Sequence, residues 1–120
     1  MTNAHTILFV SAAEGNVSLL TEFLNDQGYQ AIPATSLAAL DAALETHDLD
    51  LVLIDADGFP PAVWERCEQL QLKSVPFLVI SQHGDAASDK GREQKAAHVF
   101  EKPVGQSALV QTITQLLDDG

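Results

Sequence analysis

The sequence is poor in basic residues, aromatic residues and cysteine. Six Lys and Arg stand against 17 Asp and Glu, which gives a formal net charge of -11 at pH 7. This charge repels the phosphates of nucleic acids and the headgroups of anionic lipids, so we expect the chain to bind neither nucleic acid nor membranes. The single cysteine, Cys67, excludes an internal disulfide framework and a Cys-x-x-Cys redox or zinc site.

Long hydrophobic runs and glycine-rich motifs are also missing. The apolar runs ILFV and LVLI are too short to span a bilayer, and no basic, apolar leader precedes the first of them, so we expect a cytoplasmic protein. No G-x-G-x-x-G or P-loop pattern occurs, and the four histidines lack the spacing of a metal motif. With 46% hydrophobic residues and no repeat or linker-like segment, the sequence predicts a single domain over residues 1–120.

Short apolar runs alternate with segments of helical periodicity. The strand candidates are Thr6 to Val10, Tyr29 to Pro33, Leu51 to Ile54, Val75 to Ile80 and Val99 to Phe100. The helix candidates are Glu14 to Gln27, a segment after Ser36, a segment from Pro61, a thinly anchored stretch within Gln82 to Gln94, and Gln106 to Leu117. Strands alternating with helices predict a parallel sheet with helices on both faces, because right-handed crossovers of this length cover both sides. The common strand order is 2-1-3-4-5.

Individual residues refine this prediction. Gly28 is placed to end the first helix, and Ser36 is placed to cap the second. Pro33 cannot donate a ladder hydrogen bond, which places its strand near an edge of the sheet. The apolar stripe of the first helix is expected to contain Val17, Leu19, Leu20, Phe23 and Leu24.

Polar residues follow or end four of the predicted strands, namely Ser11, Asp55, Ser81 and Lys102. The carboxyl ends of parallel strands meet at one rim of the sheet, where ligands bind in such folds. There Asp55 would act as a phosphoryl-accepting nucleophile, with Ser81 and Lys102 holding phosphate oxygens. Each residue alone is more often a cap or a solvated surface group, so the prediction rests on their combination.

The segments LDLVLIDAD, VPFLVIS and VFEKP resemble the third, fourth and fifth strand ends of response-regulator receiver domains of two-component signalling. The resemblance covers essentially the whole chain and implies a flavodoxin-like (βα)5 three-layer sandwich. It implies Asp55 at the phosphoacceptor position, Ser81 at the hydroxyl position and Lys102 at the invariant-lysine position. It also implies a cis bond between Lys102 and Pro103, an isomer that proline makes accessible.

The end of the first strand departs from the family pattern. The family has a pair of acidic residues there, which hold magnesium together with the phosphoacceptor, whereas this chain reads ILFVSAAE with Ser11 and Ala12 in those places. Because magnesium prefers carboxylate and other oxygen ligands, we expect its binding to be weak or absent, and we expect no other cofactor. Asp57 is the one nearby acid that would compensate, although the family uses a backbone carbonyl there. Ser11 and Glu14 also have the spacing of a helix capping box.

The fifth strand carries a second departure. Where the family places an aromatic switch three residues before the lysine, this chain has Val99. Phe100 is adjacent to it, but neighbouring strand residues point to opposite faces, so Phe100 is predicted to be core. With neither metal nor aromatic switch, Asp55 is left to pair with Lys102, and this ion pair would hold the domain in one state.

These residues favour a degenerate receiver, or pseudo-receiver, that acts as a protein-protein interaction module rather than as an enzyme. Its signalling would be independent of magnesium-dependent aspartyl phosphorylation, and its partners would be a histidine kinase or an output domain or protein. One alternative is a functional phosphoacceptor receiver, phosphorylated at Asp55 by a histidine kinase. A second is a small-molecule-binding flavodoxin-like module. A hydrolytic enzyme is disfavoured, because the strand ends supply no nucleophile with an adjacent base.

Overall fold

A five-stranded parallel sheet organises the chain in the computed structural model, which describes residues 5–12, 14–46, 48–55, 62–81, 96, 98–101 and 105–118. The strands are β1 (Thr6–Val10), β2 (Gln30–Ala34), β3 (Leu51–Asp55), β4 (Phe77–Ser81) and β5 (His98–Glu101). The helices are α1 (Glu14–Asp26), α2 (Leu37–Thr46), α3 (Val63–Leu72) and α5 (Gln106–Asp118). The strand order β2-β1-β3-β4-β5 confirms the predicted topology. None of the described helices is long and apolar enough to cross a membrane.

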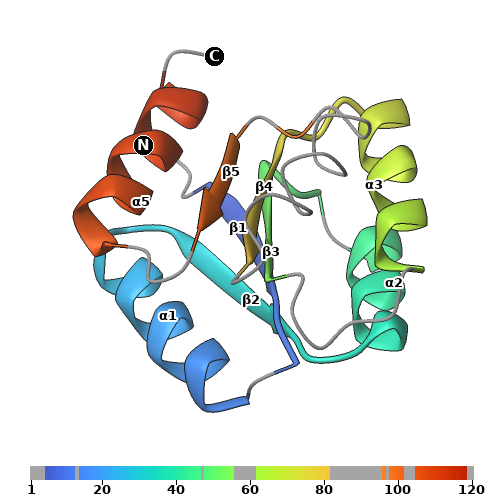
Figure 1. Cartoon of the computed structure of the whole chain (residues 1–120), viewed down its shortest axis with the longest axis horizontal. Helices are drawn as coiled ribbons and strands as arrows, with labels where there is room; N and C mark the ends of the chain where they lie inside the picture. The colour runs from blue at the N-terminus through green and yellow to red at the C-terminus, as the bar shows by residue number, and fades with distance from the viewer. Residues whose placement is uncertain are drawn as a thin grey trace.

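The helices cover both faces of the sheet, with α1 and α5 on one side and α2 and α3 on the other (Figure 1). The central strand β3 shows why its sequence is apolar at consecutive positions. Val52 and Ile54 pack into the core on the α2 and α3 side, whereas Leu51 and Leu53 pack into the core on the α1 and α5 side. All residues of β3 are therefore buried, as a strand covered on both faces requires.

The sequence signals at β2 and α2 are confirmed. β2 lies at one edge of the sheet, and the N–H of Gln30 donates to the carbonyl of His5 on the β1 side. Because N–H groups alternate in direction along a strand, position 33 faces the open edge, so the missing N–H of Pro33 costs no ladder hydrogen bond. Ser36 is the N-cap of α2, because its Oγ accepts a hydrogen bond from the backbone N–H of Ala39 at 3.1 Å.

Two helix predictions differ from the structure. Leu19, which was predicted to lie in the buried stripe of α1, is 70% exposed. It lies about 140° around the helix from the fully buried Leu24, so one helix face cannot bury both residues. The helix predicted from Pro61 begins at Val63 with Ala62 as its N-cap, and no side chain caps it. Pro61 itself and the stretch from Gln82 to Gln94 lie outside the described residues.

The C-terminal end of α1 adopts a left-handed turn at glycine. The backbone N–H of Tyr29 donates to the carbonyl of Leu24 at 3.1 Å, and the N–H of Gly28 donates to that of Asn25 at 3.0 Å. This pair of bonds is the Schellman pattern, which places the residue after the helix in the left-handed region. Gly28 has φ 94° there, which confirms its predicted role as the helix terminator.

The C-terminal end of α3 repeats this motif with a different residue at the left-handed position. The N–H of Val75 donates to the carbonyl of Leu70 at 2.9 Å, and the N–H of Ser74 donates to that of Gln71 at 3.0 Å. Ser74 has φ 59° and is the one non-glycine residue of positive φ among those described. Its Cβ is therefore held close to a carbonyl oxygen. This conformation costs free energy in an L-residue, whereas glycine has no Cβ and avoids the cost.

Exchanging the residues at these two left-handed positions is expected to change stability in opposite directions. Ser74→Gly should raise the free energy of unfolding by up to about 1 kcal/mol, and Gly28→Ala should lower it by about 1 kcal/mol or more. A Cβ built on Gly28 meets nothing within 4 Å, so the loss would come from the backbone and not from a collision. Urea unfolding measures both changes, and effects of the same sign would contradict this interpretation.

Candidate functional site

Three polar side chains at the carboxyl ends of neighbouring strands are buried. Ser11 follows β1 and is 0% exposed, Asp55 ends β3 and is 4% exposed, and Ser81 ends β4 and is 3% exposed. Among the described residues, no other polar or charged side chain is buried to this degree. Buried polar groups need hydrogen-bond partners, so this rim of the sheet is the place where a specific polar arrangement is built.

Ser11 and Asp55 contact each other directly. The parallel register pairs Val10 with Ile54, so the residues that follow them lie side by side. The hydroxyl of Ser11 donates a hydrogen bond to Oδ2 of Asp55 at 3.2 Å, and the pair is buried. The backbone N–H of Ser11 donates to the carbonyl of Ala34 at 3.0 Å, which fixes the end of β1 beside the edge strand. Ser11 therefore positions the Asp55 carboxylate through a neutral hydroxyl.

The capping box predicted for Ser11 and Glu14 is wrong in its position. For Ser11 to be the N-cap, α1 would have to begin at Ala12, but it begins at Glu14. The hydroxyl of Ser11 instead reaches across to the neighbouring strand and contacts Asp55. The position of both residues at one rim follows from the sequence, whereas this contact was not predicted.

The described part of the rim does not fit a magnesium ion. Ser11 supplies a hydroxyl and Ala12, which is exposed, supplies a methyl group where carboxylates would be needed. Glu101 ends β5, two strands away from Asp55. No group of three or more His, Cys, Asp or Glu comes together in the part of the chain that the structure describes. One carboxylate and one neutral hydroxyl are a weak donor set for a hard divalent cation.

The structure describes Ser81 but not the three other residues predicted at or near this rim. The register pairs Asp55 with Ile80, so Ser81 lies one residue farther along the neighbouring strand, at the same rim. Asp57, Lys102 and Pro103 lie outside the described residues. The Asp55–Lys102 ion pair, the cis bond before Pro103 and a metal-ligand role for Asp57 therefore stay predictions.

The switch position of β5 holds a small aliphatic side chain directed into the core. Val99 packs with the core on the α2 and α3 side, whereas Phe100 packs with the core on the α1 and α5 side. The prediction that Phe100 points to the opposite face and belongs to the core is thus confirmed. Its ring also contacts that of His98 edge-on, with centroids 4.5 Å apart. Phe100 therefore cannot reach the face on which Val99 lies.

Comparison with known proteins gives matches of structure but not of sequence. No protein-family model and no curated protein sequence matches the chain. Solved structures match it over nearly its whole length, and several of them are receiver domains or single-domain response regulators. The chain therefore has the CheY-like, flavodoxin-type fold of these domains, as the sequence predicted.

Three of these structures indicate how far the likeness extends. The non-phosphorylated HemR receiver domain of Leptospira biflexa is 25% identical, with a TM-score of 0.79 over 94% of both chains. A CheY-like receiver domain protein of Methanospirillum hungatei JF-1 is 21% identical, with a TM-score of 0.87 over 98% of this chain and 96% of that one. Chemotaxis response regulator CheY4 of Vibrio cholerae is 18% identical, with a TM-score of 0.81 over 96% of this chain and 100% of that one.

Proposed function

We propose that this chain is a receiver-type signalling module that acts through protein contacts, without magnesium-dependent phosphorylation of Asp55. The observation that carries the proposal is the hydrogen bond from the Ser11 hydroxyl to Asp55 Oδ2 at 3.2 Å. In the receiver family that the chain resembles, carboxylates stand at this end of the first strand. Here the residue after β1 that contacts Asp55 is Ser11, and its hydroxyl is uncharged.

The missing negative charge bears on phosphoryl transfer. A divalent cation neutralises the charge on a transferring phosphoryl group, which is worth several kcal/mol in the transition state. Since about 1.4 kcal/mol corresponds to a factor of ten in rate, a rim that does not hold the cation loses several powers of ten. Asp55 would then be a buried structural carboxylate that Ser11 positions.

Val99, at the switch position of β5, supports the same proposal. In the family, an aromatic side chain at this position relays the state of the rim to the partner-binding face. Valine has a stiff χ1 torsion and no polar atom, and Val99 packs against the core on the α2 and α3 side. A rim that does not change state and a side chain that does not move suit a module whose partner recognises one fixed conformation.

The partners we propose are proteins, either a histidine kinase or an output domain or protein, and the chain itself would not be an enzyme. The net charge of -11 disfavours nucleic acid as a partner. A cytoplasmic location fits a partner of this kind.

Beryllofluoride with magnesium mimics the aspartyl phosphate and tests the proposal directly. In a ¹H–¹⁵N spectrum of the wild-type chain, we expect the amide signals of Asp55 and Ser81 to stay in place when both reagents are added. Asp55→Asn is the control, because it removes the carboxylate to which beryllofluoride would attach. Saturable shifts in the wild type that disappear in Asp55→Asn would establish a functional phosphoacceptor instead. Shifts with a nucleotide or flavin alone would favour a small-molecule-binding module.

A further inference from the structure

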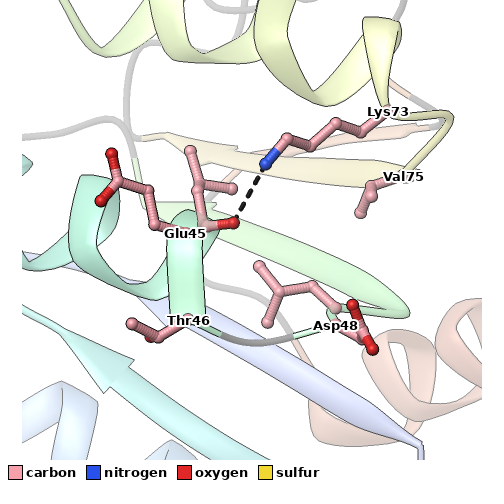
Figure 2. Close-up of a pocket in the computed structure, with 7 residues that line it drawn as sticks. Glu45, Thr46, Asp48, Lys73 and Val75 are labelled. Atoms are coloured by element: carbon pink, nitrogen blue, oxygen red, sulfur yellow. Dashed lines mark hydrogen bonds between the residues drawn. The ribbon is translucent and has the colours of Figure 1, made fainter.

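Side chains satisfy backbone groups that helix ends and strand edges leave open. Leu44 lies in the last turn of α2, where carbonyls have no partner within the helix. The ammonium group of Lys73 donates a hydrogen bond to this carbonyl oxygen at 3.0 Å, drawn as a dashed line in Figure 2, at a pocket of about 460 Å³ that Asp48 and Val75 also line. A contact of the same kind occurs at the open edge of the sheet, where it bears on association with other chains.

The open edge of β2 presents the backbone groups of positions 31 and 33. Gln30 and Ala34 bond to the β1 side, the latter through its carbonyl, which accepts from the N–H of Ser11 at 3.0 Å. Backbone groups alternate in direction along a strand, so Ala31 and Pro33 direct theirs away from the sheet. A new strand that paired with β2 would therefore need its N–H donors from these two positions.

Neither position offers a donor to a second chain. The N–H of Ala31 donates to Oδ1 of Asn25, a side chain of α1, at 3.0 Å, and Pro33 has no N–H. Just before the strand, the N–H of Tyr29 is held by the carbonyl of Leu24 in the turn that ends α1. The outward edge of β2 thus offers no free N–H, and carbonyl oxygens alone cannot form a ladder.

Charge does not protect this edge. Exposed edge strands commonly carry charged residues, which disfavour pairing with another chain. The sequence of β2 is QAIPA and contains no charged residue, and its side chains Ala31 and Ile32 are partly buried against the two cores. An uncharged strand at the edge of a sheet is a template for strand addition unless its backbone is blocked.

We propose that Asn25 and Pro33 together block the β2 edge, so that a second copy of the chain cannot extend the sheet there. If two β2 strands paired antiparallel about Ile32, Ala31 of each copy would lie opposite Pro33 of the other. Every ladder hydrogen bond of that pairing within β2 would take its donor from position 31 or position 33. A protein partner likewise cannot bind by adding a strand to β2. The block does not depend on the chemistry at Asp55.

Hydrogen exchange tests the contact made by Asn25. We expect the amide of Ala31 to exchange slowly in the wild type although it lies on an open edge, and Asn25→Ala should raise its rate roughly tenfold. The amide of Gln30, which bonds to the β1 side, is the internal control and should keep its rate. Equal rates for Ala31 in the two proteins would overturn the role given to Asn25.

Sedimentation equilibrium tests the block itself, at chain concentrations up to about 1 mM, where weak dimers are populated. In about 0.5 M NaCl, which screens the repulsion between chains of net charge -11, the wild type should be monomeric. Asn25→Ala/Pro33→Val supplies both donors and should dimerise at least about tenfold more strongly than either single variant. In that dimer, protection of the Ala31 amide should return as the chain concentration rises, which locates the contact at β2.

The single variants are the matched controls, because each leaves one of the two donors blocked. Valine is favoured in strands, so Pro33→Val should keep the fold, which the amide spectrum checks. A double variant that is folded and stays monomeric would overturn the proposal. So would a dimer of it that leaves the Ala31 amide unprotected. A single variant that dimerises as strongly as the double variant would contradict the joint role of Asn25 and Pro33.

Discussion

Replacing Ser11 by aspartate is expected to make the chain respond to magnesium. Two ligands at right angles around magnesium, each about 2.0–2.1 Å from the ion, lie about 2.9 Å apart. The Ser11 hydroxyl oxygen lies 3.2 Å from Asp55 Oδ2, which is close to that separation. Position 11 therefore already holds an oxygen near a ligand position and lacks only the charge. Ser11→Asp supplies the charge at the place where the receiver family carries an acidic residue.

Ser11→Asp is expected to change the stability of the chain in two ways, which have opposite signs. Without metal, two buried carboxylates side by side repel each other, so Ser11→Asp should unfold at a lower temperature than the wild type. Magnesium at one hundred times its dissociation constant should then add about 2.7 kcal/mol to the free energy of unfolding. For a domain of this size, that corresponds to a rise in melting temperature on the order of 10 °C.

Ser11→Asn is the matched control for this experiment. Asparagine has nearly the shape of aspartate but no charge, so its melting temperature should be the same with and without magnesium. Calorimetric titration of the three proteins with magnesium chloride gives the affinities directly. A magnesium response of the wild type equal to that of Ser11→Asp would sink the proposal that the hydroxyl at position 11 removes the metal.

The fold could be predicted because its signals are local and agree with one another. The apolar run of β3, the N-cap at Ser36, the terminator Gly28 and the edge proline Pro33 each fix one element or its position. A parallel sheet with short crossovers then leaves few topologies. The gathering of Ser11, Asp55 and Ser81 at one rim follows from that topology, since each lies where a strand ends.

The contacts within the site could not be predicted in the same way. Ser11 fits two local patterns, a capping box and a strand end, and only the register of β1 against β3 decides between them. The exposure of Leu19 depends on which face of α1 meets the sheet. Leu20 and Phe23 also lie on the face that packs against the core. The pocket lined by Leu44, Asp48, Lys73 and Val75 is made by two segments that are distant in sequence, so no single stretch of sequence indicates it.

Cys67 is expected to be unreactive in the folded chain. Its side chain is fully buried in the core between α3 and the sheet, and burial raises the pKa of the thiol from 9.0 to about 12. The thiolate is the form that reacts with alkylating reagents. At pH 8 the thiolate fraction is about 10⁻⁴ at the raised pKa and about 0.1 at the ordinary one, so alkylation by iodoacetamide should be at least about 1,000-fold slower in the native chain than in urea.

The same shift in the pKa of Cys67 makes stability depend on pH. Because the folded pKa is raised, the unfolded chain releases this proton first, and the stability that the neutral thiol contributes is complete below about pH 9. It is lost as the pH rises from about 9 toward about 12, at about 1.4 kcal/mol per pH unit. Cys67→Ala has no thiol to ionise, while all other titrating groups are shared. Urea unfolding between about pH 8 and 11 should therefore give a steeper decline for the wild type, and parallel curves would show that Cys67 ionises as readily in the folded chain as in the unfolded one.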